Sequence, residues 1–325
     1  MDCKKIEQLE AAVHSGYNNT VGLVVQKNGE TLYEQYFHGY TAASTPHVFS
    51  VTKSVFSALV GIAIEKNLIK SVDQKVLDFF PDYVPAESQS TVRHITIKNM
   101  LTMTAPYAYT AEPYEAFFMS ENWLQFALAL LGGGNGKIGD FLYSAIVGTH
   151  ILSGILARAA GMPILDFATK HLFSPMEMYV PHSVPLRTKE EHLAAMGSKS
   201  TSGWAVDPEG LHPASWGLFL KTRDMEKIGQ LYLNSGMWNG AQIVPARWVA
   251  ESTRGHSRWG SLPYGYLWWV IDGTKHIYAA MGDGGNTIYI NAQKQLVVSV
   301  SALFVPEAKD RIGLIQEYIE PLLEG

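Results

Sequence analysis

Strand-like segments at both ends of the chain constrain its fold more than any other feature of the sequence. Residues 21–25 and 31–37 are rich in Val, Leu, Tyr and Phe, and Asn28-Gly29 lies between them. An Asn-Gly pair between two such segments is typical of a β-hairpin. Strand patterns return near the other end, at 264–271, 277–281, 287–290 and 296–300. Because all these strands need partners, we expect one sheet built from both ends of the chain.

The segment between these strands has the periodicity of helices. Apolar residues at helical spacing predict helices over 50–66, 123–131 and 146–160, with further helices over 6–16, 222–233 and 308–323. We therefore predict an α/β (α+β) fold with a central antiparallel sheet flanked by helices. Residues 1–48 and 203–325 would form the sheet domain, and residues 49–202 an inserted, mainly helical domain. The cleft between the two is the expected place for a ligand.

The first candidate for chemistry is Ser50, which begins Ser50-Val51-Thr52-Lys53 directly before the apolar segment 55–64. In a helix, residues three apart share one face, so the Ser50 hydroxyl and the Lys53 amine would lie within reach of each other. A serine hydroxyl needs a base to take its proton, and an amine can be that base once burial and nearby positive charge lower its pKa. The alternative is a helix start with a solvated lysine.

Tyr143 is the second candidate, because it stands just before the helical segment 146–160. Held beside the Lys53 ammonium, its phenol could complete a proton relay with Ser50. Without Ser50 and Lys53 it would be interpreted as a packing residue, since the chain has 16 tyrosines.

The third candidate is the glycine pair in Asp283-Gly284-Gly285-Asn286, between two predicted strands. Glycines inside a sheet region can mark a close approach of the backbone to a ligand. Acyl transfer needs such an approach, because backbone N–H groups must meet the developing oxyanion. The alternative is a bulge or a tight turn.

Taken in order, these motifs resemble the serine beta-lactamase and penicillin-recognising superfamily. The closest resemblance is to its class C-like branch, which includes beta-lactamase-fold esterases, D-aminopeptidases and 6-aminohexanoate-dimer hydrolases. The likeness covers nearly the whole chain and extends to residues 95–104, 243–248 and 264–269. It implies a beta-lactamase/transpeptidase-like fold and serine hydrolase chemistry without a cofactor.

Site residues follow from the resemblance position by position. Ser50 matches the acylated nucleophile, Lys53 its partner base, and Tyr143 the tyrosine that shuttles protons to the leaving group and the hydrolytic water. Asp283-Gly284-Gly285 stands where the family has Lys-Thr-Gly or His-x-Gly. On that alignment the backbone N–H groups of Ser50 and Asn286 would form the oxyanion hole.

The expected substrate-binding positions are Ala145, Asp283, Gly284 and Gly285. Two of them, Ala145 and Asp283, depart from the family pattern. Ala145 replaces an asparagine whose side-chain amide helps to hold a substrate amide. Asp283 replaces a cation that helps to hold the substrate carboxylate of beta-lactams, and a carboxylate would meet like charge there. We therefore expect weak or absent beta-lactamase activity.

Three hypotheses for the function follow. The first is a serine hydrolase that forms an acyl-enzyme on Ser50 from a small ester or amide. The second is a penicillin-binding or D-amino-acid peptidase relative, in which Asp283 favours a substrate amine over a carboxylate. The third is a non-catalytic binding protein that kept the fold, which the altered second and third motifs would suit.

Other classes of function have little support in the sequence. There is no Gly-x-Ser-x-Gly elbow, since 255–259 lacks the final glycine, and no His-Glu-x-x-His motif or cysteine cluster for a metal. His150 and His171 are interpreted as helix residues with satisfied hydrogen bonds. The net charge of -5 gives no electrostatic support for nucleic-acid binding.

Composition also bears on where the protein acts. The chain has a single cysteine, Cys3, which fits a reducing compartment, and no segment with the apolar length of a membrane span or of a signal peptide. We expect a cytoplasmic protein, or an exported one if a leader has been removed. Its expected partner is a small-molecule ester or amide, or a D-amino-acid peptide, and the sequence leaves the oligomeric state open.

Overall fold

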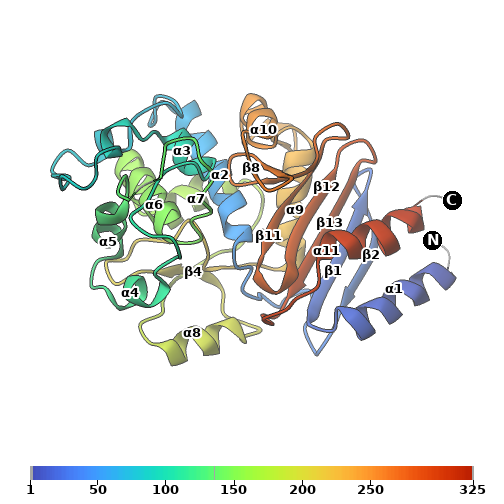
Figure 1. Cartoon of the computed structure of the whole chain (residues 1–325). Helices are drawn as coiled ribbons and strands as arrows, with labels where there is room; N and C mark the ends of the chain where they lie inside the picture. The colour runs from blue at the N-terminus through green and yellow to red at the C-terminus, as the bar shows by residue number, and fades with distance from the viewer. Residues whose placement is uncertain (1–2, 135, 324–325) are drawn as a thin grey trace.

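A computed structural model describes residues 3–134 and 136–323 of the chain, and an eight-stranded antiparallel sheet dominates one side of it (Figure 1). The strand order is β2-β1-β13-β12-β11-β10-β9-β8, so strands from both ends of the chain lie in one sheet. The strands are β1 Thr20–Lys27, β2 Glu30–Tyr36, β8 Ser257–Trp259, β9 Leu262–Tyr264, β10 Trp269–Asp272, β11 Ile277–Gly282, β12 Asn286–Asn291 and β13 Leu296–Ala302. This arrangement confirms the predicted fold class.

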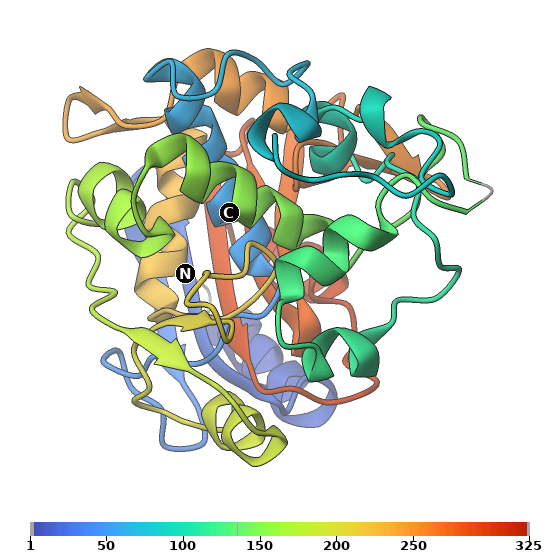
Figure 2. The ribbon, with the colours of Figure 1, turned by 90° about the vertical axis from the view of Figure 1, so that its left-hand side faces the viewer.

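Helices cover both faces of this sheet and build the other side of the molecule (Figures 1 and 2). They are α1 Cys3–Gly16, α2 Val51–Glu65, α3 Ile97–Leu101, α4 Tyr114–Met119, α5 Trp123–Leu130, α6 Val147–Ala160, α7 Ile164–Ala168, α8 Lys189–Met196, α9 Thr222–Leu233, α10 Ala246–Ser252 and α11 Arg311–Leu314, with helical turns continuing to Leu323. Short strands form two small sheets: β3 Ser183–Pro185, β4 Gly203–Val206 and β5 Leu218–Phe219, and separately β6 Met237–Trp238 with β7 Ala241–Gln242.

Local sequence explains how the two ends of the chain meet. Asn28 and Gly29 both have positive φ angles, 53° and 81°, and they make the turn that joins β1 to β2. β1 then pairs antiparallel with β13 along its whole length, from Thr20 opposite Ala302 to Lys27 opposite Leu296. The N-terminal hairpin is therefore an edge of the C-terminal sheet.

Helix α2 is the core of the molecule. Its residues from Val51 to Ala63 are all buried, because α2 lies between β11 and α6. Figure 2 looks onto the helical side, with α6 in front of α2 and the strands behind both. A helix that is apolar on every side is stable only when neighbours surround it, and this burial fixes where its N-terminal residue Ser50 stands.

Two features of the C-terminal sheet differ from the sequence prediction. The expected strand over 264–271 is two strands, β9 and β10, because the chain turns between Gly265 and Trp268, with Leu267 at a φ of 62°. The short strand β8 was not predicted, and it pairs with β9 as a hairpin at the sheet edge. The domain boundaries proposed at residues 48/49 and 202/203 stay a prediction.

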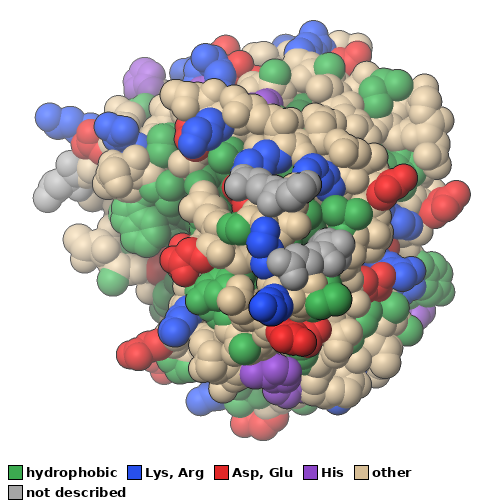
Figure 3. Space-filling model, turned by 90° about the vertical axis from the view of Figure 1, so that its right-hand side faces the viewer, with side chains coloured by type: hydrophobic (Ala, Val, Ile, Leu, Met, Phe, Trp, Pro, Cys, Tyr) green, Lys and Arg blue, Asp and Glu red, His purple; other side chains and the backbone are tan. Residues whose placement is uncertain are grey.

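The surface and the helices add two observations. On the face beside α1 and α11, acidic side chains lie among the Lys and Arg side chains (Figure 3). Within residues 3–134 and 136–323, no single helix is long and apolar enough to cross a membrane, although the bent pair Val147–Ala160 and Ile164–Phe173 passes that test of length and composition together.

Candidate active site

Ser50 and Lys53 lie side by side at the start of α2. Phe49 has a positive φ of 49°, which turns the chain sharply so that Ser50 becomes the N-cap residue of the buried helix. The Lys53 Nζ atom lies 3.0 Å from Ser50 Oγ and 3.3 Å from the carbonyl oxygen of Ser215. The structure thus brings the two predicted residues into hydrogen-bond contact.

Burial changes the acid–base behaviour of Lys53. Its side chain is 2% exposed, and loss of solvation lowers the pKa of its amine to about 8, although the carboxylates of Asp283 and Glu112 raise it in part. Desolvation disfavours the charged form of an amine, and the positive end of the α2 dipole acts in the same direction. A measurable fraction of Lys53 is therefore neutral near pH 7 and able to accept a proton.

Tyr143 completes this group from the segment before α6. Its ring centroid lies 5.6 Å from Lys53 Nζ, and the ring stacks against Trp259 at 6.1 Å and Trp269 at 5.8 Å. Burial raises the pKa of the Tyr143 phenol well above its usual range, Asp283 adds to the rise, and a side-chain hydrogen bond with Ser50 opposes it. The phenol is therefore protonated at neutral pH, which suits a proton donor better than a base.

Glu112 holds the turn that carries Tyr143, and sequence reasoning did not find it. Its carboxylate accepts hydrogen bonds from the backbone N–H groups of Ala145, Ile146 and Val147 at 3.1, 3.0 and 2.7 Å. These groups begin α6 and would otherwise lack partners. At Ala145 it is therefore the backbone amide that is engaged, while its methyl group cannot hold a substrate amide as an asparagine would.

Directly before the third motif, Gly282 is the residue packed against the start of α2, where Ser50 lies. A Cβ atom on Gly282 would lie 2.6 Å from the Val48 carbonyl oxygen and 2.9 Å from Ser50 N. Only glycine permits so close an approach of β11 to the start of α2. The predicted place of such an approach is the pair that follows, Gly284-Gly285.

Gly284 and Gly285 instead form the turn between β11 and β12. Their φ angles are 75° and 94°, and Cβ atoms there would meet Leu303 and Arg311 rather than Ser50. Asn286 is buried, and its side chain bonds the Asp283 and Ala302 carbonyl oxygens. The oxyanion hole expected from Ser50 and Asn286 stays a prediction.

Asp283 makes the entrance of the site acidic. Its side chain is exposed, and its charge raises the pKa values of Lys53, Tyr143 and Tyr114. Tyr114 is half exposed and belongs to an open cavity of about 550 Å³, which is lined by Glu112, Pro113, Tyr114, Glu115, Ala116 and Met119.

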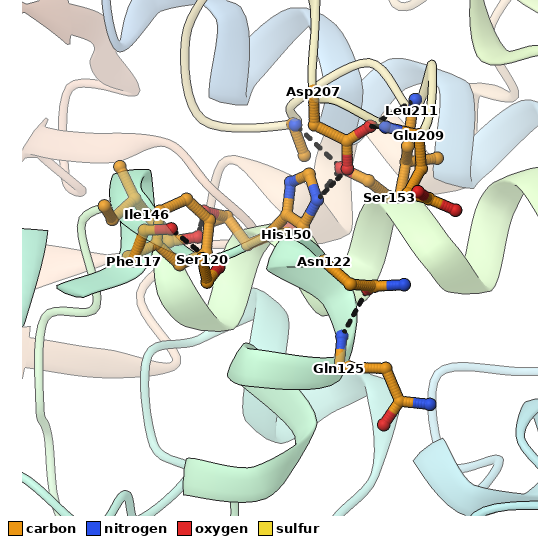
Figure 4. Close-up of polar contacts among 12 residues, drawn as sticks. Phe117, Ser120, Asn122, Gln125, Ile146, His150, Ser153, Asp207, Glu209 and Leu211 are labelled. Carbon is orange, nitrogen blue, oxygen red and sulfur yellow. Dashed lines mark hydrogen bonds and ion pairs between the residues drawn. The ribbon is translucent and has the colours of Figure 1, made fainter.

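A buried contact ties Asp207 to His150 of α6 (Figure 4). His150 Nε2 lies 3.0 Å from Asp207 Oδ2, with both side chains 1% exposed. Asp207 Oδ1 accepts the backbone N–H groups of Glu209 and Leu211 at 2.9 and 2.7 Å. Four residues past Leu211, Ser215 presents its carbonyl to Lys53. His150 is thus a helix residue, as predicted, but only its Nε2 has a hydrogen-bond partner, since its buried Nδ1 has none among the described residues. The described part of the chain holds no group of three or more His, Cys, Asp or Glu that could bind a metal ion.

The chain is similar to known proteins along most of its length. The Beta-lactamase family model matches residues 7–318. A 6-aminohexanoate-dimer hydrolase of Paenarthrobacter ureafaciens is 20% identical over 320 residues, which cover 91% of this chain and 76% of that protein.

Two solved structures are similar along almost the whole chain. The octameric penicillin-binding protein homologue from Pyrococcus abyssi has a TM-score of 0.73 at 19% identity, covering 100% of this chain and 78% of that one. EstCE1, a hydrolase with promiscuous acyltransferase activity, has a TM-score of 0.72 at 17% identity, covering 99% and 98%. At these identities the structural likeness shows the fold alone.

Proposed function

Because this chain belongs to the beta-lactamase family, we propose that it is a serine hydrolase that forms an acyl-enzyme on Ser50. The observation that carries the proposal is the 3.0 Å contact between Ser50 Oγ and a buried Lys53 whose pKa is lowered to about 8. A nucleophile beside a base that is partly neutral at physiological pH is what acylation needs. The names of the relatives, a dimer hydrolase and a hydrolase with acyltransferase activity, agree with it.

The directions of the pKa shifts of Lys53 and Tyr143 suggest their roles in the proposed mechanism. Neutral Lys53 takes the proton from Ser50 Oγ as the oxygen bonds to the carbonyl carbon of an ester or amide. When the bond from that carbon to the leaving group breaks, the Tyr143 phenol gives its proton to the leaving group, and the Lys53 ammonium returns a proton to Tyr143. Water then attacks the acyl group and restores Ser50, and the carboxylic acid is released.

Lys53 and Tyr143 separate as base and acid because burial acts oppositely on an amine and a phenol. It lowers the pKa of Lys53 and raises that of Tyr143. The Ser215 carbonyl, 3.3 Å from Nζ, gives the amine a second partner that fixes its direction toward Ser50. For the oxyanion, the backbone N–H groups of Ser50 and Asn286 are the proposed donors.

The decisive experiment uses an acyl probe and intact-protein mass spectrometry. The wild-type protein and Ser50→Ala are incubated with a fluorophosphonate and with p-nitrophenyl esters, and the added mass is located by peptide mapping. We expect labelling and ester turnover in the wild type and neither in Ser50→Ala. Equal labelling of the two proteins would refute the proposal, and an unlabelled wild type would favour the non-catalytic alternative.

A specific observation favours substrates with an amine near the scissile bond. Asp283 places a carboxylate at the entrance that acts on Lys53, Tyr143 and Tyr114 alike, where beta-lactam-processing relatives are expected to carry a cation. At a separation of several ångströms near a protein surface, one such charge changes binding of a charged group by about 1 kcal/mol, or roughly fivefold. Small amine-bearing esters or amides, including D-amino-acid derivatives, are therefore the proposed substrates.

Two p-nitrophenyl esters of equal chain length, one ending in an amine and one in a carboxylate, test this preference. The wild type should favour the amine in kcat/KM, Asp283→Asn should lose most of the preference, and Asp283→Lys should invert it. An unchanged ratio across the three proteins would reject the role of Asp283 while leaving the serine chemistry intact.

A further inference from the structure

Glu112 is the most heavily engaged carboxylate near the proposed active site. Besides the N–H groups of Ala145, Ile146 and Val147, it accepts hydrogen bonds from Tyr109 OH at 3.2 Å and from Ser144 Oγ at 3.4 Å. Three backbone N–H groups and a pair of hydroxyls that also bond each other hold this one side chain, so its position is fixed. The three N–H groups and Ser144 belong to the turn that begins α6.

That turn is what places Tyr143. Ser144 and Ala145 follow Tyr143 directly, and Ser144 Oγ is 2.7 Å from the N–H of Gly148 one helical turn later and 2.8 Å from Tyr109 OH. Ser144 is buried, so water cannot replace these partners. If the carboxylate is lost, consecutive N–H groups lose their acceptor and the start of α6 loosens, which moves the Tyr143 phenol relative to Ser50.

Glu112 also contributes charge to the same cluster. Its carboxylate raises the pKa of Lys53 and that of Tyr143, although burial is the larger effect on both. The other groups that face Lys53 are Asp283 from the segment after β11, the Tyr143 phenol, the Ser50 hydroxyl and the uncharged Ser215 carbonyl. Glu112 is buried deeper than Asp283, so salt screens it less.

We propose that Glu112 is a positioning residue for acyl transfer, because its carboxylate fixes the turn that carries Tyr143 beside Lys53. The inference rests on the proposed acyl chemistry at Ser50. It makes Glu112 act through Tyr143 and Lys53 rather than on the substrate. A merely structural cap would affect stability and rate but would leave the titration of Lys53 where it is.

Three variants separate these effects. Glu112→Gln removes the charge and keeps one acceptor oxygen, Glu112→Asp keeps the charge on a shorter side chain, and Glu115→Gln is the matched control. Glu115 lines the same cavity and is exposed, and it is not among the charges that act on Lys53. Circular dichroism and the melting temperature establish that each variant is folded.

Two readouts are compared over pH 6 to 10: the rate of Ser50 acylation by a neutral p-nitrophenyl ester, and the NMR titration of 15N-labelled Lys53 Nζ, assigned with Lys53→Arg. In Glu112→Gln we expect both midpoints to fall by roughly half a pH unit, from a charge several ångströms away, and the limiting rate to fall about tenfold. Glu112→Asp should keep the wild-type midpoints with a reduced rate. Glu115→Gln should match the wild type in both.

The outcomes distinguish this inference from the proposed function. Unshifted midpoints in a folded Glu112→Gln, or an equal shift in Glu115→Gln, would overturn the role of Glu112 even if Ser50 is acylated normally. A wild type that is not acylated at Ser50 would overturn the proposed function and the acyl-transfer role together. The NMR titration reports the electrostatic part in either case, since it needs no substrate.

Discussion

Replacing Asp207 with alanine should destabilise the protein far more than replacing it with asparagine. The Asp207 carboxylate is buried, contacts His150 Nε2 at 3.0 Å and accepts the N–H groups of Glu209 and Leu211. Alanine removes all three interactions and leaves the ring nitrogen and two backbone donors without acceptors. Asparagine keeps an oxygen for the two N–H groups and can donate its own N–H to the imidazole in its other tautomer.

The magnitudes follow from these contacts. A donor left without an acceptor in the interior costs about 1–3 kcal/mol, and alanine leaves three donors in that state, so we expect a loss of about 4 kcal/mol for Asp207→Ala. Asp207→Asn should cost about 1 kcal/mol, the size of one ordinary hydrogen bond, because only the charge is lost. Since whole domains are stable by about 5–15 kcal/mol, the alanine variant would retain only part of its stability.

Urea unfolding followed by tryptophan fluorescence measures both changes. With a slope near 3 kcal/mol per molar, the midpoint should fall by roughly 1.3 M for alanine and 0.3 M for asparagine. Arg247→Ala is the control, since Arg247 and its partner Glu65 are exposed by 74% and 56%, and such a pair contributes less than about 1 kcal/mol. Equal midpoints for the two Asp207 variants would refute the reasoning, as would an alanine variant no less stable than the control.

Three further predictions concern the nucleophile and the interior. Gly282→Ala should lower Ser50 acylation by at least about 100-fold in stopped-flow measurements, because its Cβ would displace β11 from Ser50 N; a nearly normal rate would mean that the approach is not needed. In the wild type, acylation should rise with pH and level off above about 8 as Lys53 becomes neutral, and a midpoint near 10 would contradict the effect of burial. Burial lowers the pKa of His47 to about 3, whereas its value in the unfolded chain is 6.5. Between these two pH values only the unfolded chain binds the proton, so the stability of the fold decreases as the pH falls from 6.5 toward 3. His47→Gln can still accept the Gly217 N–H, and between pH 7 and 4.5 its free energy of unfolding should fall by about 2 kcal/mol less than that of the wild type in urea titrations; an equal fall in both proteins would count against this account.

Local patterns in the sequence were sufficient to predict most of the fold. The Asn28-Gly29 turn, the apolar helix after Ser50 and the strand periodicity near the C-terminus each correspond to an observed element. The proximity of Ser50 and Lys53 also follows from sequence, because helical geometry fixes residues three apart. The placement of Tyr143 beside them needed the resemblance to a known family, since nothing local distinguishes it from other tyrosines.

The rest of the site depends on contacts that leave no local pattern. The Ser215 oxygen that receives Lys53 belongs to the backbone, which every residue has. Glu112 caps a helix that starts about 35 residues later, so no capping motif in the usual spacing marks it. Gly282 differs from its neighbours Gly284 and Gly285 only in which part of the protein lies against it. Such features become visible once the chain is folded.

Burial and charge have separate consequences at Lys53 and Tyr143. Burial moves the two pKa values in opposite directions, and for this reason the proposed mechanism makes the amine the base and the phenol the acid. The carboxylates of Asp283 and Glu112 raise both values, which opposes burial at Lys53 and reinforces it at Tyr143. Changing Asp283 can therefore shift the pH at which Lys53 loses its proton, and it can change the charge near a bound substrate. Neither change exchanges the proposed roles of Lys53 and Tyr143. This explains how an anion can stand where relatives are expected to carry a cation while the acyl chemistry proposed for Ser50 is retained.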